Sequence, residues 1–277
     1  MAIITISRGS MSGGKALAEC VANALDAPCV GREILVDAAA RVGVPERVLA
    51  EKIERGPGLW ERLTLERRIY VVAVQSALAE HATAGRLVYH GYAGHLLLRG
   101  LPSVLRIRLV APMEYRIRKE MESSGVDRER AEQAIEHLDQ GRLAWTRAMY
   151  GVDVRDPVLY DLVINLEVMS IPSACAVVVE AANRPEFLIT DEVRSRLRDF
   201  TLACRVKLAL ATHPASRGLD LSVTTAAGVV SISGEVPSAI MLTHASLRWE
   251  HELRSVAQGV EGVREVVLDI QPFDAYH

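Results

Sequence analysis

The sequence is poor in aromatic residues and has no large excess of charge of either sign. Aromatic side chains make up only 5% of its 277 residues, so we do not expect the stacking platforms that bind single-stranded nucleic acid. The formal net charge is −3, from 32 basic and 35 acidic side chains, unlike the basic surface of most nucleic-acid-binding proteins. The composition therefore argues against a nucleic-acid partner.

Long apolar runs are absent, and so is the pattern of a targeting signal. The apolar start covers only residues 2–6 and is followed by a basic residue, whereas a signal peptide has a basic start and a longer apolar core. Ionisable side chains interrupt the most apolar region, namely Arg86, His90, His95 and Arg99. No run approaches the roughly 18 apolar residues of a membrane span. We expect a soluble, cytoplasmic protein.

Cysteine is scarce as well. The four cysteines are Cys20, Cys29, Cys175 and Cys204, and they form neither a CxxC pair nor the spacing of a zinc site. Widely scattered cysteines in a chain of this length are typical of reduced, mostly buried thiols in a cytosolic protein. His90 and His95 have no carboxylate or cysteine at helical spacing nearby, so we expect structural histidines and no metal site.

The chain does contain alternating strand-like and helix-like segments, and its length suits two domains. Apolar or β-branched runs predict strands at residues 2–7, 86–89, 104–110 and 160–166. Helical periodicity predicts helices at 15–25, 32–41, 45–54, 59–84, from 112 onward, 127–150 and 172–183. Such alternation is typical of an α/β domain with a parallel sheet and helices on both faces. We expect this domain to span residues 1–185.

The remainder of the chain has a different pattern. A helix is expected at 191–211, two strands at 219–225 and 229–236, a helix at 238–258 and a last strand at 263–270. This α-β-β-α-β unit is large enough for a small core of its own. We place a second, α+β domain at residues 199–277.

A glycine-rich segment follows the first expected strand directly. Residues 9–15, Gly-Ser-Met-Ser-Gly-Gly-Lys, contain the G-x-x-x-x-G-K core of a phosphate-binding loop, between a strand and a helix as that motif requires. Glycines allow backbone N–H groups to converge, the helix dipole attracts anions, and Lys15 would bridge phosphates. Ala16 stands where such loops usually carry a hydroxyl for Mg²⁺. A strand-turn-helix without a ligand stays open as the alternative.

Five segments together resemble the cytidylate kinase-like family of nucleoside monophosphate kinases. They occur in the family's order over residues 1 to about 183: 4–8 with 12–14, 31–35, 112–118, Asp139-x-x-Arg142, and 160–165. The resemblance implies a P-loop kinase-like fold, and phosphoryl transfer from ATP to CMP or dCMP with Mg²⁺.

The resemblance also implies roles for particular residues. ATP would bind at the glycine loop, through Ser10, Ser12, Gly13, Gly14, Lys15 and Ala16. Lys15, Arg142 and Asp139 would be catalytic, with Arg142 closing from a lid and oriented by Asp139. Arg32 would meet the phosphate of the acceptor, and Arg116 and Arg118 are further substrate-binding candidates from the lid.

Some positions depart from the family pattern. The lid of better-known CMP kinases reads Arg-Asp-x-x-Asp-x-x-Arg, but Ile135 and Glu136 occupy the first two places here. The family also tends to have Gly-Arg-Gly where this chain has residues 90–92, His-Gly-Tyr, so an arginine is lost unless a charged His90 partly replaces it. Together with Ala16, these departures leave a second hypothesis open. It is a catalytically weak or inactive nucleotide-binding regulator that acts through its C-terminal domain.

From about Arg205 the chain resembles a BON domain, a small module first described in bacterial osmotic-stress and secretion proteins. Residues 218–221, 228–236 and 260–266 carry this resemblance. It implies association with phospholipid membranes or with proteins, and no chemistry. We expect a protein partner or self-association rather than membrane contact, and a domain that only packs on its neighbour is the alternative.

Overall fold

The computed structural model describes residues 2–54, 65–91, 93–237 and 245–273, which form two sheets with helices. The larger sheet has the order β2-β3-β1-β4-β5, and all of its neighbouring strands are parallel. Its strands are β1 (Ile3–Arg8), β2 (Cys29–Val30), β3 (Leu87–Tyr89), β4 (Val104–Val110) and β5 (Leu162–Asn165). The expected parallel α/β architecture is therefore confirmed.

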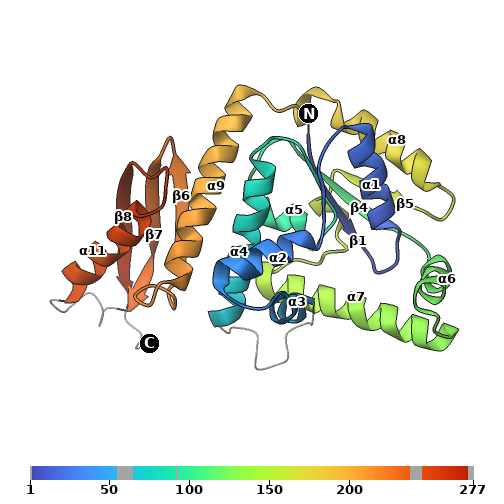
Figure 1. Cartoon of the computed structure of the whole chain (residues 1–277), viewed down its shortest axis with the longest axis horizontal. Coiled ribbons are helices and arrows are strands. Elements are labelled where there is room, and N and C mark those ends of the chain that lie inside the picture. Colours follow the sequence, from blue (N-terminus) through green and yellow to red (C-terminus); the bar gives the residue numbers. More distant parts are fainter. Residues whose placement is uncertain (1, 55–64, 92, 238–244, 274–277) are drawn as a thin grey trace.

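Helices cover both faces of this sheet (Figure 1). Helices α1 (Gly14–Ala24) and α8 (Ile171–Ala182) share a buried core with Ile4 and Ile6 of β1. Helices α2 (Glu33–Val42), α3 (Glu46–Glu54) and α4 (Leu65–Ala82) share another core with Ile3. Because side chains alternate along a strand, an apolar, β-branched β1 supplies both cores and is buried on both faces.

The strand order creates a crevice at the carboxyl end of the sheet. Strand β1 pairs with β3 on one side and with β4 on the other, so the chain passes from one half of the sheet to the other around β1. Ligands of open α/β sheets bind at such a switch point, outside the carboxyl ends of the strands. The glycine loop follows β1 at this place, as the sequence predicts.

Two helices extend beyond the sheet and contain the segments that resemble the family's lid, and we call them the lid. They are α6 (Met113–Ser124) and the long α7 (Arg128–Tyr150), whose N-cap Asp127 accepts a hydrogen bond from the Arg130 N–H at 2.9 Å. Ile117, Ala131 and Ile135 are buried between them. The apolar residue at position 135 therefore belongs to the packing of the lid.

Short elements complete the first unit. They are α5 (Gly94–Leu97) and the 3₁₀ helices η1 (Pro157–Leu159) and η2 (Pro185–Phe187). The helix expected at 59–84 is observed as α4 from Leu65, and its predicted start lies outside the described residues. None of the helices in the described ranges is long and apolar enough to cross a membrane.

The second unit is built on α9 (Asp191–Thr212), which lies between the two sheets (Figure 1). Strands β6 (Leu221–Ala226) and β7 (Val229–Pro237) are antiparallel, and β8 (Glu265–Phe273) runs parallel to β7. Helix α11 (Ala245–Gln258) packs on the same core as the second half of α9. The element order matches the predicted α-β-β-α-β unit, but its expected start at residue 199 falls inside a continuous helix.

Helix α9 belongs to both cores. Val193 and Leu197 of its first half are buried with the helices of the large sheet, whereas Val206 and Leu210 of its second half are buried against the small sheet. No separate linker divides the two units along α9.

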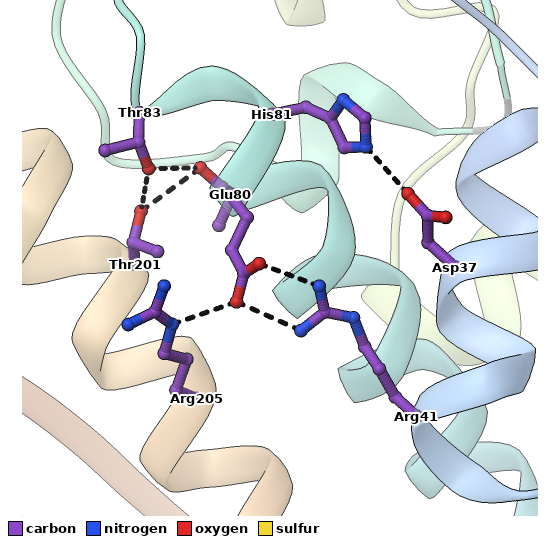
Figure 2. A network of polar contacts seen from close by, with 8 residues as sticks. Asp37, Arg41, Glu80, His81, Thr83, Thr201 and Arg205 are labelled. Atoms are coloured by element: carbon purple, nitrogen blue, oxygen red, sulfur yellow. Dashed lines mark hydrogen bonds and ion pairs between the residues drawn. The ribbon is translucent and has the colours of Figure 1, made fainter. Parts of the chain in front are cut away.

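A polar network fastens α9 to α4 and α2 (Figure 2). The Glu80 carboxylate accepts two hydrogen bonds from Arg41, at 3.0 and 2.8 Å, and one from Arg205 at 2.9 Å. Thr83 and Thr201 hydroxyls lie 2.9 Å apart beside it. Hydrogen bonds from Arg41, and then from Arg205, lower the pKa of Glu80 from 4.5 to about 2. Glu80 is therefore a charged connection between elements of both units.

The cysteines correct one sequence-based expectation. Cys20 of α1 and Cys175 of α8 form a disulfide, with Cα atoms 6.1 Å apart, so the prediction of reduced thiols is wrong for this pair. The two helices pack against each other on one face of the sheet, which joins positions 155 residues apart. Cys29 and Cys204 are free thiols, and burial raises the pKa of Cys204 to about 12.

Candidate functional site

A cavity of about 430 Å³ opens at the carboxyl end of the large sheet. Its walls come from the ends of β1, β2 and β3, from β4, from the start of α2, and from α7 with the loop that follows it. Among the described residues, the charged side chains that line it are five arginines and one carboxylate: Arg8, Arg32, Arg108, Arg142, Arg155 and Asp139. Such a lining favours an anionic ligand.

The glycine loop borders this cavity between β1 and α1. Gly13 is the N-cap of α1 with φ 77°, a left-handed conformation that glycine adopts without steric cost. Gly14 begins the helix, and a Cβ there would overlap the side chain of Arg8, which lies across the first turn. No side chain caps α1 and no acid occupies its first turn, so its positive end is available to an anion.

The lid contacts the loop through Ser10. The Ser10 N–H donates to Asp139 Oδ1 at 3.0 Å, and its carbonyl oxygen accepts from Arg116 Nε at 2.7 Å. Its hydroxyl accepts from Arg142 Nη1 at 3.0 Å. Ser12 is also buried, and its hydroxyl has no hydrogen-bond partner in the part of the chain that the structure describes.

Asp139 is the centre of these contacts. Arg116, with only 11% of its side chain exposed, lies 2.5 Å from Asp139 Oδ2, and Arg142 lies 4.0 Å from Oδ1. Four of the residues predicted from the sequence are thus brought together, because α7 crosses the glycine loop. Arg116 does not line the cavity; it holds the carboxylate and the loop.

Other predicted residues lie farther from the cavity. Lys15 is 73% exposed, its Nζ lies 3.7 Å from Glu19 of the next helical turn, and it is not part of the cavity lining. Ala16 and Arg118 are exposed on the surfaces of α1 and α6. Arg32 does line the cavity, and its Nε donates to Glu46 at 2.7 Å.

The positions that depart from the family pattern have structural explanations. Ile135 is 1% exposed and packs α7 against α6, so it does not face the cavity. His90 lines the cavity, but burial, and then the charge of Arg8, lower its pKa, which disfavours the charged form that could replace an arginine. Burial similarly lowers the pKa of His95 to about 3. The described residues contain no group of three or more potential metal ligands of the His, Cys, Asp and Glu types.

Sequence reasoning missed three of the arginines in the lining. Arg108 could have been found, because it and Arg106 are charges within a strand that reads as buried. Arg8 ends β1 immediately before the glycine loop, which is also a usable signal. Arg155 comes from the loop after α7 and is oriented by two hydrogen bonds to Asp153, at 3.0 and 2.7 Å. No sequence pattern marks it.

Comparisons with known proteins match the part of the chain that forms the larger sheet. A family model described as the cytidylate kinase-like family matches residues 3–168. The cytidylate kinase of Pyrobaculum arsenaticum is 24% identical over 181 residues, which cover 65% of this chain and 92% of that protein. The cytidylate kinase of Methanopyrus kandleri is 36% identical over 63 residues, 23% of this chain and 33% of that protein.

Among solved structures, an uncharacterized protein from Eubacterium ventriosum has a similar fold. The TM-score is 0.52 at 16% identity, covering 66% of this chain and 100% of that one. The family match ends at residue 168, before α9 and the second sheet.

Proposed function

Because the chain belongs to the cytidylate kinase-like family, we propose that it is a nucleoside monophosphate kinase that transfers the terminal phosphoryl group of ATP to CMP or dCMP. The observation that carries this proposal is the arginine-rich cavity beside a glycine loop at the switch point of a parallel sheet. Phosphoryl transfer needs positioned positive charge and no covalent nucleophile, which is what this lining offers.

The donor would occupy the glycine loop. The uncapped N-terminus of α1, with Gly13 and Gly14, suits the phosphates of ATP, and the buried Ser12 hydroxyl still lacks a hydrogen-bond partner within the described ranges. Lys15 would leave Glu19 and turn toward the phosphates. Its exposed side chain makes that movement inexpensive.

The acceptor would occupy the cavity. Arg32 and Arg142 would bind the phosphate of the nucleoside monophosphate, since a guanidinium pairs with two phosphate oxygens at once. Leu35, Ala93 and Leu143 provide apolar walls for the sugar and base. Asp139 would act as a positioning residue, because it holds Arg116 and lies near Arg142.

In the reaction, an oxygen of the acceptor phosphate attacks the terminal phosphorus of ATP, and the bond from that phosphorus to the bridging oxygen breaks to release ADP. The attacking oxygen is already ionised at neutral pH, because the second pKa of a phosphate monoester is about 6. A general base is therefore unnecessary. The arginines would stabilise the charge that spreads over the transferring group.

Mg²⁺ would accompany ATP. Ala16 offers no hydroxyl, and no cluster of three ligands exists among the described residues, so the chain does not provide a cage of its own for the ion. Protein sites commonly hold Mg²⁺ through substrate phosphates and water, and the ion would then neutralise the donor phosphates. We expect this arrangement here. The glycine loop also contains the buried Ser12 hydroxyl, which has no hydrogen-bond partner in the described structure.

The hypothesis of an inactive regulator has less support. It rested on the missing loop hydroxyl at Ala16 and on missing charges, but Arg8 and Arg108 add positive charge to the cavity from β1 and β4. Position 135, where a lid arginine was expected, faces the interior of the lid. For the second unit, we keep the BON-like resemblance as a proposal, with a protein partner or a second copy as its ligand.

A coupled phosphorylation assay tests the main proposal. With ATP and Mg²⁺, we expect the full chain to phosphorylate CMP and dCMP faster than UMP and AMP. Lys15→Ala should weaken ATP binding by about tenfold or more, since a charged hydrogen bond to phosphate is lost. Lys119→Ala is the matched control, because Lys119 is an exposed lysine of α6 that pairs with Glu122. No binding of ATP by the wild type in calorimetry would contradict the proposal.

A further inference from the structure

Strand β4 carries two arginines in an otherwise apolar sequence. Arg106 and Arg108 are two residues apart, so their side chains leave the strand on the same face. In register they lie opposite Thr5 and Ser7 of β1. Both side chains are partly buried, and a partly buried cation is costly unless it meets an anion.

The two arginines have different surroundings. Arg106 is neutralised by Asp161, through Nε to Oδ2 at 3.0 Å and Nη2 to Oδ1 at 2.7 Å. Arg108 donates from Nη1 to the Ser7 hydroxyl at 3.2 Å, and its guanidinium carbon lies 5.9 Å from the centre of the Tyr160 ring. No carboxylate lies within ion-pair distance of Arg108 among the residues that the structure describes.

Neither Tyr160 nor His95, which lie beside Arg108, carries the negative charge that would neutralise it. Tyr160 is buried, and its hydroxyl donates to the Val154 carbonyl at 2.7 Å. His95, which lies 3.3 Å from the Tyr160 hydroxyl, has a pKa of about 3 because of burial and the charges of Arg108 and Arg106, so it is neutral. Among the described residues, Arg108 contacts a hydroxyl and an aromatic ring but no anion. A half-buried cation of this kind that lines an open cavity is suited to an anion from solution.

We propose that Arg108 binds the phosphate of the acceptor nucleotide. This inference rests on the proposed function and adds to it a phosphate-binding residue from strand β4. Arg108 shares the cavity with Arg32 and Arg142, whereas Lys15 at the donor end lies outside the lining. Its partner Ser7 stands two residues before Gly9, the first residue of the glycine loop, so Arg108 lies close to the junction of the donor and acceptor positions.

The test compares CMP with cytidine, which lacks the phosphate, by calorimetry on the full chain. For Arg108→Gln, we expect the preference for CMP over cytidine to fall by at least about tenfold. The melting temperature without ligand should stay the same or rise, because an uncompensated charge is removed. Arg108→Lys should restore part of the preference.

Arg106→Gln is the matched control on the same strand and face. It should lower the melting temperature, because Asp161 loses its ion-pair partner, and keep the preference for CMP over cytidine. The inference is overturned if Arg108→Gln keeps the wild-type preference. It is equally overturned if that variant melts earlier and loses cytidine and CMP binding alike, as a structural role would require.

If the proposed kinase function is wrong, the experiment gives a result that differs from a failure of the Arg108 inference alone. If the wild type binds none of CMP, dCMP, UMP and AMP, the kinase proposal fails, and inorganic phosphate becomes the probe. Tighter phosphate binding by the wild type than by Arg108→Gln then supports an anion site at Arg108. Equal binding by the two proteins overturns it.

Discussion

Replacing Glu80 by glutamine tests the connection between the two units. The carboxylate of Glu80, in α4, joins Arg41 of α2 to Arg205 of α9 (Figure 2). Glutamine keeps the size of the side chain and one acceptor oxygen but removes the charge. Both arginines then lose their anion.

The expected loss of stability follows from the pKa of Glu80. A fall from 4.5 to about 2 corresponds to about 3 kcal/mol of preference for the charged form in the folded protein. Glu80 and Arg41 are 28% exposed and Arg205 is 42% exposed, so water screens part of this energy. We expect Glu80→Gln to lower the free energy of unfolding by about 1–2 kcal/mol at pH 7.

The dependence on pH has a definite sign. Because the folded pKa is depressed, the stabilisation is fully present above the unfolded pKa of 4.5 and is lost as the pH falls toward about 2. Urea unfolding of wild type and variant at pH 7, 5, 4 and 3.5 should therefore show a difference that narrows below pH 4.5.

Glu180→Gln is the control for this experiment. Glu180 lies near the end of α8 and pairs with Arg184, which follows that helix. The two side chains are 68% and 58% exposed, and such pairs contribute at most about 0.5 kcal/mol. A Glu80 effect that does not change with pH, or that does not exceed this control, would refute the reasoning.

Three further predictions concern the lid, the cysteines and turnover. Arg142→Ala should leave ATP affinity in calorimetry within a few-fold and lower the rate of CMP phosphorylation by about 10³-fold, because a charge near the transferring group is lost. Thiol titration of the unfolded, unreduced protein should find two of the four cysteines, with Cys20 and Cys175 appearing only after reduction; four without reductant would contradict the disulfide. Ile135→Ala should destabilise the protein by about 2–4 kcal/mol in urea unfolding, because it leaves a cavity between α6 and α7; an unchanged stability would show that the lid does not pack this way.

Much of the fold was accessible from the sequence because its signals are local. The strand expected at 104–110 is observed as Val104–Val110, and the helix expected at 127–150 as Arg128–Tyr150. Each has a clear periodicity or cap that its own residues supply. Strand β2 and helix α5 were missed because two and four residues are too few to show any period.

The site was less accessible, because side-chain partners are chosen by tertiary contacts. The resemblance to the cytidylate kinase-like family paired Asp139 with Arg142, but only the fold brings Arg116 to Asp139. Arg116, a substrate-binding candidate from the sequence, pairs with the Asp139 carboxylate in the structure. The disulfide was hidden for the same reason, since the packing of α1 on α8 decides which cysteines meet.

Helix α9 has a consequence for how the molecule unfolds. Its Leu197 and Leu210 are buried in different cores, yet they belong to one uninterrupted run of backbone hydrogen bonds. If either core unfolds, the half of α9 that packs in it loses its tertiary contacts. The other half, which packs in the second core, is then destabilised at its new end. The two sheets should therefore share one cooperative transition, in place of the two expected of modules joined by a flexible tether.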